Sequence, residues 1–289
     1  MIIRSKDRVL IQGITGKQGT FWTERMQECG TNVVGGVNPK KAGTTHCGVP
    51  VYASAVAAAK DGPIDVSVMF IPPLAARAAA IDAIEAGVKT LVILTEFTPV
   101  RDVMEIVAIA KDAGCRIVGP NTAGLVTPGE CFIGIMPGFN KNIFQPGRIG
   151  VVSRSGSLGT LICLNLVTAG YGQSAFIGIG GDPVSGTTFR DALEAFEADD
   201  RTDAIVLVGE IGGTKEEEAA ELAASMSKPI TSFIAGGASP PGKKMGHAGA
   251  IVMGDKGTHA SKKKALEAAG VRVMSMPSEV GVHLKEMLG

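Results

Sequence analysis

Short apolar runs rich in Val and Ile alternate with longer alanine-rich stretches in the first half of the chain. The apolar runs predict buried strands at 7–12, 32–37, 66–71, 90–95 and 115–118. The stretches between them predict helices at 19–29, 54–60, 74–86 and 100–113. This alternation is typical of right-handed βαβ units, in which helices cover both faces of a parallel sheet.

The alternation lapses between 119 and 147, where Pro, Gly and Asn predominate, and we place the domain junction there. It then resumes with strands expected at 148–153, 174–178, 203–208, 229–234 and 271–274. Helices are expected at 156–168, 187–198, 215–226, 260–269 and 278–287. The fold class is therefore α/β: a Rossmann-like domain over 1–125, a linker over 126–146, and a flavodoxin-like parallel α/β domain over 147–289.

Composition narrows the classes of function. A chain of 289 residues can form two domains with their own cores, and its 45% hydrophobic share is that of a globular protein. The 28 basic and 28 acidic residues give zero net charge, so no global field attracts nucleic acid or an anionic membrane. Any anion must therefore be bound by a local site.

The N-terminus carries charges within its first eight residues and shows neither a signal peptide nor a recognisable transit peptide. The most apolar stretch, 66–81, is interrupted by prolines and is shorter than the ~20 residues of a membrane span. Five scattered cysteines show no metal-binding spacing and indicate a reducing compartment without structural disulfides. We expect a cytoplasmic protein, or one of the mitochondrial matrix if the source is eukaryotic, with no metal site in this chain.

The first glycine-rich turn, 13–20, reads Gly-Ile-Thr-Gly-Lys-Gln-Gly-Thr and joins a strand to a helix. Free backbone N–H groups and the helix dipole favour a phosphate at such a turn, although a turn without ligand is the alternative. The second strand ends in Val-Asn-Pro-Lys-Lys, with no acid for the ribose of NAD. The lysines suit a phosphorylated ribose, as in NADP or coenzyme A. Because no hydride-transfer residues are recognisable, we favour coenzyme A.

The second domain begins in the same way, with a strand followed by Ser-Arg-Ser-Gly-Ser at 153–157 and a helix. Hydroxyls, an arginine and a helix N-terminus indicate a second anion site; serines that serve only as helix caps are the alternative. By contrast, the run Ser-Lys-Lys-Lys at 261–264 is expected to be the solvated start of a helix.

His247 lies in the glycine-rich stretch Gly-Lys-Lys-Met-Gly-His-Ala-Gly-Ala, 242–250, where small neighbours allow a large ligand to approach the imidazole. Glu210 is the acid in another turn, which follows the strand 203–208. If both lie at one sheet edge, the carboxylate can accept a ring N–H and leave the other nitrogen nucleophilic. The alternatives are a histidine that lies in a glycine-rich loop without a chemical role and a solvated loop glutamate.

Several motifs together resemble the α subunits of the succinyl-CoA synthetase family. They are the first glycine turn, Gly-Gly-Val-Asn-Pro at 35–39, Leu-Thr-Glu at 94–96, Gly-Pro-Asn at 119–121, Ser-Arg-Ser-Gly, Gly-Ile-Gly-Gly-Asp-Pro, Gly-Glu-Ile-Gly-Gly and Gly-His-Ala-Gly-Ala, in unbroken order. The resemblance implies that the first domain binds coenzyme A and that His247 is phosphorylated. It also implies a β subunit with an ATP-grasp fold that binds ATP or GTP with Mg²⁺, in an αβ or (αβ)₂ assembly of the tricarboxylic acid cycle.

The same resemblance assigns site residues. Those expected to bind coenzyme A are Thr15, Gly16, Lys17, Gln18, Lys41, Leu94, Thr95 and Glu96. Glu210 is expected to support the active histidine. The residues expected to hold the phosphate are Ser153, Ser155, Gly156 and Ser157.

The sequence departs from the family at the expected acid pocket. Thr160 and Leu161 stand where the family has tyrosine and glutamate, and Thr122 and Ala123 replace Cys-Pro. Loss of an aromatic side chain enlarges a pocket and changes which acid fits. Succinate is the expected substrate, with malate and citrate as alternatives. A catalytically silent CoA-binding regulator and an NADP-dependent dehydrogenase are the other classes considered.

Overall fold

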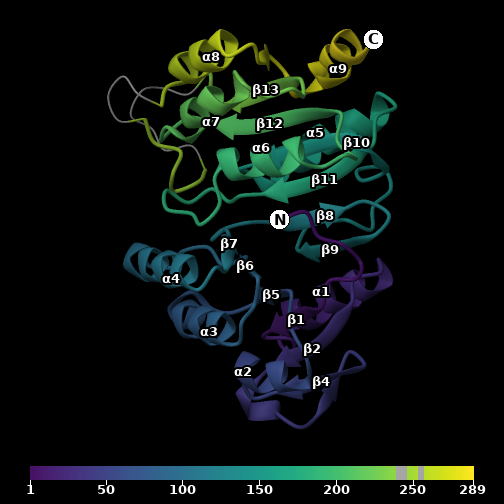
Figure 1. Ribbon diagram of the computed structural model, residues 1–289, viewed down its shortest axis with the longest axis vertical. Coiled ribbons are helices and arrows are strands. Elements are labelled where there is room, and N and C mark those ends of the chain that lie inside the picture. The colour runs from purple at the N-terminus through teal and green to yellow at the C-terminus, as the bar shows by residue number, and fades with distance from the viewer. Residues whose placement is uncertain (239–245, 253–256) are drawn as a thin grey trace. The chain divides into compact units, whose positions relative to one another are not determined.

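The computed structural model describes residues 1–238, 246–252 and 257–289 (Figure 1). The chain forms two compact units. The first contains Met1, residues 3–139 and residues 184–187, and the second contains Ile2, residues 140–183 and residues 188–289. Every helix in the described part of the chain is too short or too polar to cross a membrane.

The first unit is built on a sheet with the strand order β3-β4-β2-β1-β5-β6-β7. Its strands are β1 (Val9–Gln12), β2 (Val33–Val37), β3 (Thr45–His46), β4 (Val49–Tyr52), β5 (Val66–Met69), β6 (Thr90–Ile93) and β7 (Arg116–Val118). All pairs are parallel except β3 with β4. From β4 to β7 this is the Rossmann order, so the predicted fold class is confirmed for this unit.

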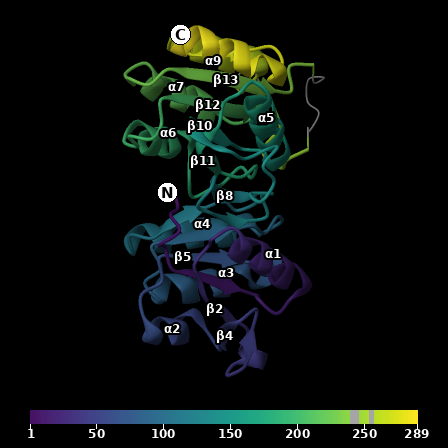
Figure 2. The same ribbon diagram turned by 90° about the vertical axis from the view of Figure 1, so that its right-hand side faces the viewer.

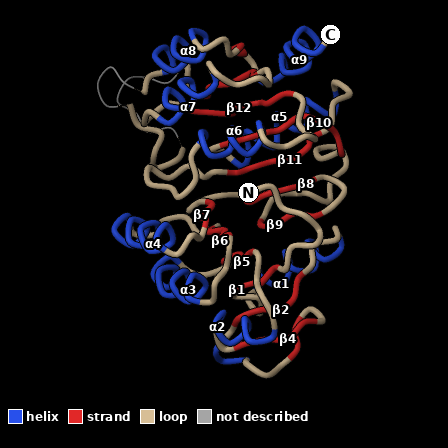
Figure 3. The backbone as a smooth tube through the Cα atoms, in the orientation of Figure 1, coloured by secondary structure: helices blue, strands red, loops and turns tan. Residues whose placement is uncertain are grey.

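Helices and 3-10 turns flank this sheet (Figure 3). They are α1 (Lys17–Glu28), η1 (Pro39–Lys41), α2 (Ala55–Ala58), η2 (Ala59–Asp61), α3 (Pro73–Glu85) and α4 (Val100–Asp112). Helix α3 packs against α2 and α4, whereas α1 packs against β1 and β2. The first turn of α1 packs closely on the turn that follows β1: a methyl group at Gly19 would lie 2.2 Å from the carbonyl oxygen of Gly13.

The segment expected to be irregular contains a hairpin instead. Strands β8 (Gly124–Thr127) and β9 (Cys131–Gly134) pair antiparallel inside the stretch 119–147. Gly124 and Gly134 face each other at φ +106° and +119°, and a methyl group on Gly124 would lie 2.0 Å from the carbonyl oxygen of Ile133. The glycines that suggested a junction therefore allow two backbones to approach closely.

The division between the units also differs in detail from the expected boundaries. The first unit continues to Phe139, well inside the expected linker. Residues 184–187, expected in the second domain, belong to the first unit. Two hydrogen bonds tie them there, from Gly186 N–H to the Gly119 carbonyl at 3.0 Å and from the Thr187 hydroxyl to the Ile117 carbonyl at 2.5 Å.

The parallel strands of the second unit follow the order β14-β13-β12-β10-β11. They are β10 (Pro146–Ser153), β11 (Gln173–Gly178), β12 (Ala204–Glu210), β13 (Ile230–Ala235) and β14 (Arg272–Met274). This is the flavodoxin-like order, which confirms the predicted fold class for the second unit. The order reverses beside β10, so the carboxyl ends of β10 and β12 form the switch point where ligands bind in open α/β sheets.

The helices of this unit are α5 (Gly156–Thr168), α6 (Phe189–Glu197), α7 (Lys215–Ala223), α8 (His259–Ala268), η3 (Pro277–Glu279) and α9 (Val280–Leu288). Helix α7 packs against α6 and α8, and α5 packs against α9 (Figures 1 and 2). Strands β10, β11 and β12 are buried almost throughout, which places two strand ends and the start of α5 at one rigid edge.

Candidate active site

The site in the second unit centres on a hydrogen bond between His247 and Glu210, the last residue of β12. The imidazole Nδ1 lies 3.0 Å and 2.9 Å from the two carboxylate oxygens. The glutamate side chain is 7% exposed and the histidine side chain 25% exposed. Because an ionised carboxylate only accepts hydrogen bonds, Nδ1 donates and Nε2 of the neutral ring keeps its lone pair.

Glycines bring two loops into contact around the imidazole. A methyl group at Gly181 would lie 2.3 Å from Cγ of His247, so the loop after β11 packs directly on the ring. Gly249 donates its N–H to the Gly181 carbonyl at 3.2 Å, which ties the histidine loop to that loop. Residues 242–245 of the predicted motif lie outside the described residues.

The serine turn at the end of β10 forms another wall of the site. Ser155 is the N-cap of α5, and its hydroxyl lies 3.2 Å from that of Ser157. Ser153 is fully buried and donates its hydroxyl to the Ser155 carbonyl at 2.6 Å, so it braces the turn. Gly156 is the first residue of α5, a helix with no acid in its first turn. This arrangement leaves a helix N-terminus and two hydroxyls available to an anion.

A cavity of about 240 Å³ joins these elements. Its lining includes both loops and the helix start: Ser155, Ser157, Leu158, Glu210, Ile211, Ala235, Gly236, Gly246, His247 and Ala250. Thr160, predicted to contact the acid, is not among these lining residues. It lies one turn further along α5, and its hydroxyl donates to the Gly156 carbonyl at 2.8 Å.

Arg154 does not extend into the expected anion site. Its side chain is 2% exposed and lies 3.2 Å from Oε1 of Glu210 through Nη2. Through Nη1 it contacts the Gly212 carbonyl at 3.0 Å and Glu216 at 3.2 Å. The guanidinium pairs with the buried carboxylates of Glu210 and Glu216. Arg154 was expected to contribute to the anion site, but it contacts these carboxylates instead.

Lys215, at the start of α7, is a charged residue near this site that the sequence did not single out. Its ammonium group donates to the Asp182 carbonyl at 3.2 Å. Burial, together with the nearby charge of Arg154, lowers the pKa of Lys215 to about 8.

In the first unit, the turn predicted to bind coenzyme A is tied to the end of β2. Helix α1 begins at Lys17, with Gly16 as N-cap, no side-chain cap and no acid in its first turn. Asn38, which sequence reasoning did not select, donates to the Thr15 hydroxyl at 2.5 Å. Gln18 follows Lys17 in the first turn of α1, and the side chains of both are exposed. The uncapped N–H groups and the exposed lysine fit a phosphate group.

The remaining residues predicted to bind coenzyme A lie after neighbouring strands of that sheet, at the same carboxyl edge. Lys41 is exposed and ends η1, directly after β2. Leu94, Thr95 and Glu96 follow β6, and the Thr95 hydroxyl donates to the Ile71 carbonyl at 2.7 Å. Glu96 is exposed. The turn 15–18, Lys41 and the segment 94–96 thus lie on one edge of the sheet.

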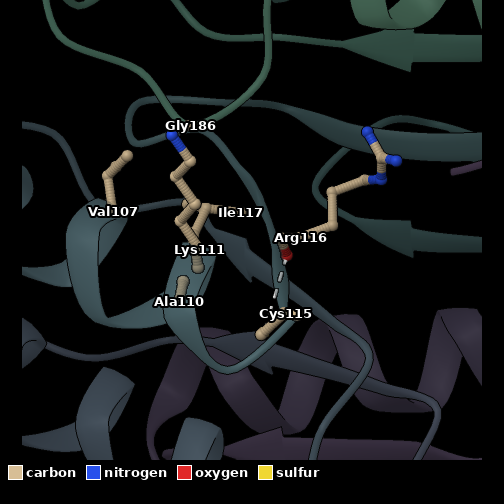
Figure 4. Close-up of a pocket in the computed structure, with 8 residues that line it drawn as sticks. Val107, Ala110, Lys111, Cys115, Arg116, Ile117 and Gly186 are labelled. Carbon is tan, nitrogen blue, oxygen red and sulfur yellow. Dashed lines mark hydrogen bonds between the residues drawn. The ribbon is translucent and has the colours of Figure 1, made fainter.

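A cavity of about 290 Å³ lies elsewhere in the first unit, beside α4 and β7 (Figure 4). Its lining residues are Val107, Ala110, Lys111, Gly114, Cys115, Arg116, Ile117 and Gly186. Burial raises the pKa of the Cys115 thiol to about 11, and the Arg116 guanidinium points away from the other lining side chains. None of the predicted site residues lines this cavity.

Models of known protein families match residues in both units. A family model described as a CoA binding domain matches residues 4–97, and one described as CoA-ligase matches residues 152–272. A succinate–CoA ligase [ADP-forming] α subunit of Archaeoglobus fulgidus is 49% identical over 288 residues, covering 100% of this chain and 99% of the relative. The chain belongs to the succinate–CoA ligase α-subunit family. The predicted family and its class, acid–thiol ligase, are therefore confirmed.

Other members of the family differ in the acid that their names specify. A succinate–CoA ligase [ADP-forming] α subunit of Methanothermobacter thermautotrophicus is 48% identical, with 100% of this chain and 98% of the relative covered. A subunit of ADP-forming sulfoacetate–CoA ligase from Bilophila wadsworthia is 42% identical, with 100% and 99% covered. Membership of this family therefore leaves the acid open.

Solved structures agree on the fold. ATP citrate lyase from Methanothrix soehngenii, solved with citrate and coenzyme A, superposes with a TM-score of 0.88 at 24% identity. The superposition covers 99% of this chain and 50% of that one, so the chain spans about half the length of that protein. At this identity the likeness concerns the fold alone.

Proposed function

We propose that this chain is the α subunit of a nucleotide-dependent acid–CoA ligase in which His247 carries a phosphoryl group. The observation that supports this most directly is the bond from Nδ1 of His247 to the buried Glu210 carboxylate, beside a cavity next to the start of α5. A histidine held in this way presents Nε2 as a nucleophile.

In the proposed reaction, Nε2 attacks the terminal phosphorus of a nucleoside triphosphate, and the nucleoside diphosphate leaves. His247 then transfers the phosphoryl group to a carboxylate oxygen of the acid, giving an acyl phosphate and a free imidazole. Coenzyme A supplies the thiol that displaces phosphate from the acyl carbon. Throughout, Glu210 holds the proton on Nδ1 and keeps the ring in one orientation.

The start of α5 would stabilise the phosphohistidine. A phosphate on Nε2 bears about two negative charges, which need hydrogen-bond donors and a positive helix end. Ser155 and Ser157 line the cavity, and Gly156 between them is the first residue of α5. Ser153 would act indirectly, by holding the Ser155 carbonyl.

Binding of coenzyme A is assigned to the first unit, at the turn 15–18, Lys41 and the segment 94–96. The nucleotide, ATP or GTP with Mg²⁺, is assigned to a β subunit with an ATP-grasp fold, in an αβ or (αβ)₂ assembly. The names of the relatives, which are α subunits, support a partner. Cytoplasmic location and a place in the tricarboxylic acid cycle remain predictions.

A phosphorylation experiment tests this assignment. The chain is purified with its partner subunit and incubated with ATP, and the product is assayed for acid-labile, base-stable phosphate. We expect such phosphate on the wild type and none on His247→Asn. If phosphate is absent while coenzyme A still binds, the chain is instead a catalytically silent CoA-binding regulator.

Succinate is the acid we propose, because the relatives at 49% and 48% identity are named for it. Thr160 and Leu161 depart from the family residues, so malate, citrate and sulfoacetate are the acids to compare. The purified complex should show at least a tenfold higher kcat/KM for succinate, since a well-matched polar site separates acids by this much or more. Equal or higher values for another acid would reassign the substrate and leave the phosphohistidine intact.

A further inference from the structure

Four charged side chains form a buried row that ends at His247. In order from the histidine they are Glu210, Arg154, Glu216 and Lys262. Their side chains are 7%, 2%, 0% and 0% exposed, respectively. The row brings together the end of β12, the turn before α5, and helices α7 and α8, which pack side by side (Figure 1).

Glu216 is the centre of this row. Its Oε1 accepts the backbone N–H of Glu210 at 3.1 Å and lies 3.2 Å from Nη1 of Arg154. Its Oε2 forms an ion pair with Lys262, whose ammonium group also donates to the Gly212 carbonyl at 3.0 Å. One carboxylate therefore fixes both the backbone of Glu210 and the cation beside the Glu210 side chain.

A buried row of charges is a poor way to stabilise a fold. Desolvation costs several kcal/mol for each buried ion, and apolar side chains of similar volume often pack as well or better. The two cations and two carboxylates cancel, so the loss of any one of them leaves a net charge in the row. Its one partly exposed end is the imidazole that the proposed reaction uses.

We propose that Lys262 and Glu216 are positioning residues that control the charge and orientation of His247 through Arg154 and Glu210. This inference rests on the proposed function, in which Nε2 must be unprotonated to attack phosphorus. Lys262 neutralises Glu216, and Glu216 shares Arg154 with Glu210. Without the lysine, Glu216 attracts Arg154 more strongly, and the field at His247 becomes more negative and favours the imidazolium.

Other charged groups near His247 lie outside the row. The loop packed on the imidazole carries Asp182, and Lys215 of α7 donates to the carbonyl of that residue. Glu217, also of α7, lies 3.7 Å from the Lys262 ammonium group. Asp182 and Lys215 are retained in every row variant. Glu217 loses its cation partner in the Lys262 variants, which makes the field more negative in the same direction, so Glu216→Gln is the variant that isolates the contribution of the row.

The sign of the effect makes the proposal testable without any substrate. The full chain has four histidines, and ¹⁵N labelling of them allows the imidazole nitrogens to be titrated by NMR, with His247→Asn assigning the signal. Lys262→Met should raise the pH midpoint of His247 protonation by about one unit, because it removes a buried positive charge. Glu216→Gln should lower the midpoint, and the double variant should return close to the wild type.

The chain offers a matched control on the same helix. Lys263 neighbours Lys262, but its side chain is 42% exposed and pairs with Glu267 at 3.7 Å, so Lys263→Met should leave the midpoint unchanged. Lys262→Arg should restore the wild-type value, because it restores the cation. If Lys262→Met does not fold, Lys262→Gln keeps a donor for Glu216 and carries the same expected shift.

Two results would overturn the proposal. One is a midpoint that stays constant in folded Lys262→Met or Lys262→Gln and Glu216→Gln, as a purely structural role requires. The other is a shift of the same sign for the loss of either charge. Failure of the proposed function would look different: wild-type His247 would take no phosphate from ATP and the partner subunit, while the opposite shifts would persist. If His247 is phosphorylated, the phosphorylation rate of Lys262→Met should begin to fall at a higher pH than that of the wild type as the solution is made more acidic.

Discussion

Gly181→Ala should disable His247 by displacing its ring, with little effect on the rest of the fold. The added methyl group would lie 2.3 Å from Cγ of the imidazole, whereas ordinary contacts begin near 3.4 Å. The two loops are tied by the bond from Gly249 N–H to the Gly181 carbonyl, so the ring must move by about 1 Å. Its bonds to Glu210, now 2.9 Å and 3.0 Å, would then exceed hydrogen-bond length.

The expected magnitude follows from this displacement. A reactive group misplaced by about 1 Å costs on the order of 100-fold in rate, and overpacking of a buried site costs about 1–3 kcal/mol of stability. Phosphohistidine formation in a single turnover with ATP and the partner subunit should therefore slow by roughly that factor. Denaturant unfolding of the chain alone should show the loss of stability.

A double-mutant cycle supplies the control. In a His247→Ala background the ring is absent, so Gly181→Ala should cost almost nothing in the free energy of unfolding. A glycine needed only for its backbone would cost the same in both backgrounds. That result, or a wild-type phosphorylation rate in Gly181→Ala, would refute the packing argument.

Three further changes test other parts of the molecule. Lys41→Ala should weaken coenzyme A binding about tenfold in a calorimetric titration and reduce its salt dependence, because one charge-assisted contact is lost; Lys60→Ala, another exposed lysine, should not. Lys215→Met should raise the free energy of unfolding at pH 7 by roughly 3 kcal/mol, because the pKa of the native lysine lies near 8 rather than 10.5. The unfolded chain binds more protons between these values, so wild-type stability should rise with pH there and the gain from the variant should disappear above pH 10.5. Glu210→Gln should slow phosphorylation by roughly 10–100-fold, since it replaces a charge-assisted hydrogen bond to Nδ1 by a neutral one; the exposed Glu218→Gln serves as its control.

The alternation of apolar and helical stretches was sufficient to predict both sheets, because parallel strands buried on both faces leave a strong apolar signal. The hairpin β8–β9 was missed, since its glycines resemble those of a loop. Residues 184–187 were assigned to the wrong unit for a different reason. Their two bonds to residues 117 and 119 join segments about seventy positions apart, and no local pattern records such contacts.

The burial of the charged residues also depends on contacts between distant segments, which the sequence does not reveal. The run Ser-Lys-Lys-Lys at 261–264 was expected to be solvated, but Lys262 is fully buried beside Glu216. Neighbouring residues of a helix point to different sides, so one lysine of such a run can point inward where a buried acidic side chain pairs with it. That acid is 46 positions earlier in the chain. The composition of a charged run therefore cannot reveal which member is buried, whereas the partner across the helix interface does.

The glycine-rich stretch drew attention to His247, but its role came from the resemblance of several motifs to the family, and the packing of Gly181 on the ring could not be predicted from either. The selectivity for an acid depends on side chains that line a space, and Thr160 turns its hydroxyl to its own helix instead. A contact between Thr160 and the acid stays a prediction, and the comparison of acids by kcat/KM is the measurement that identifies the preference.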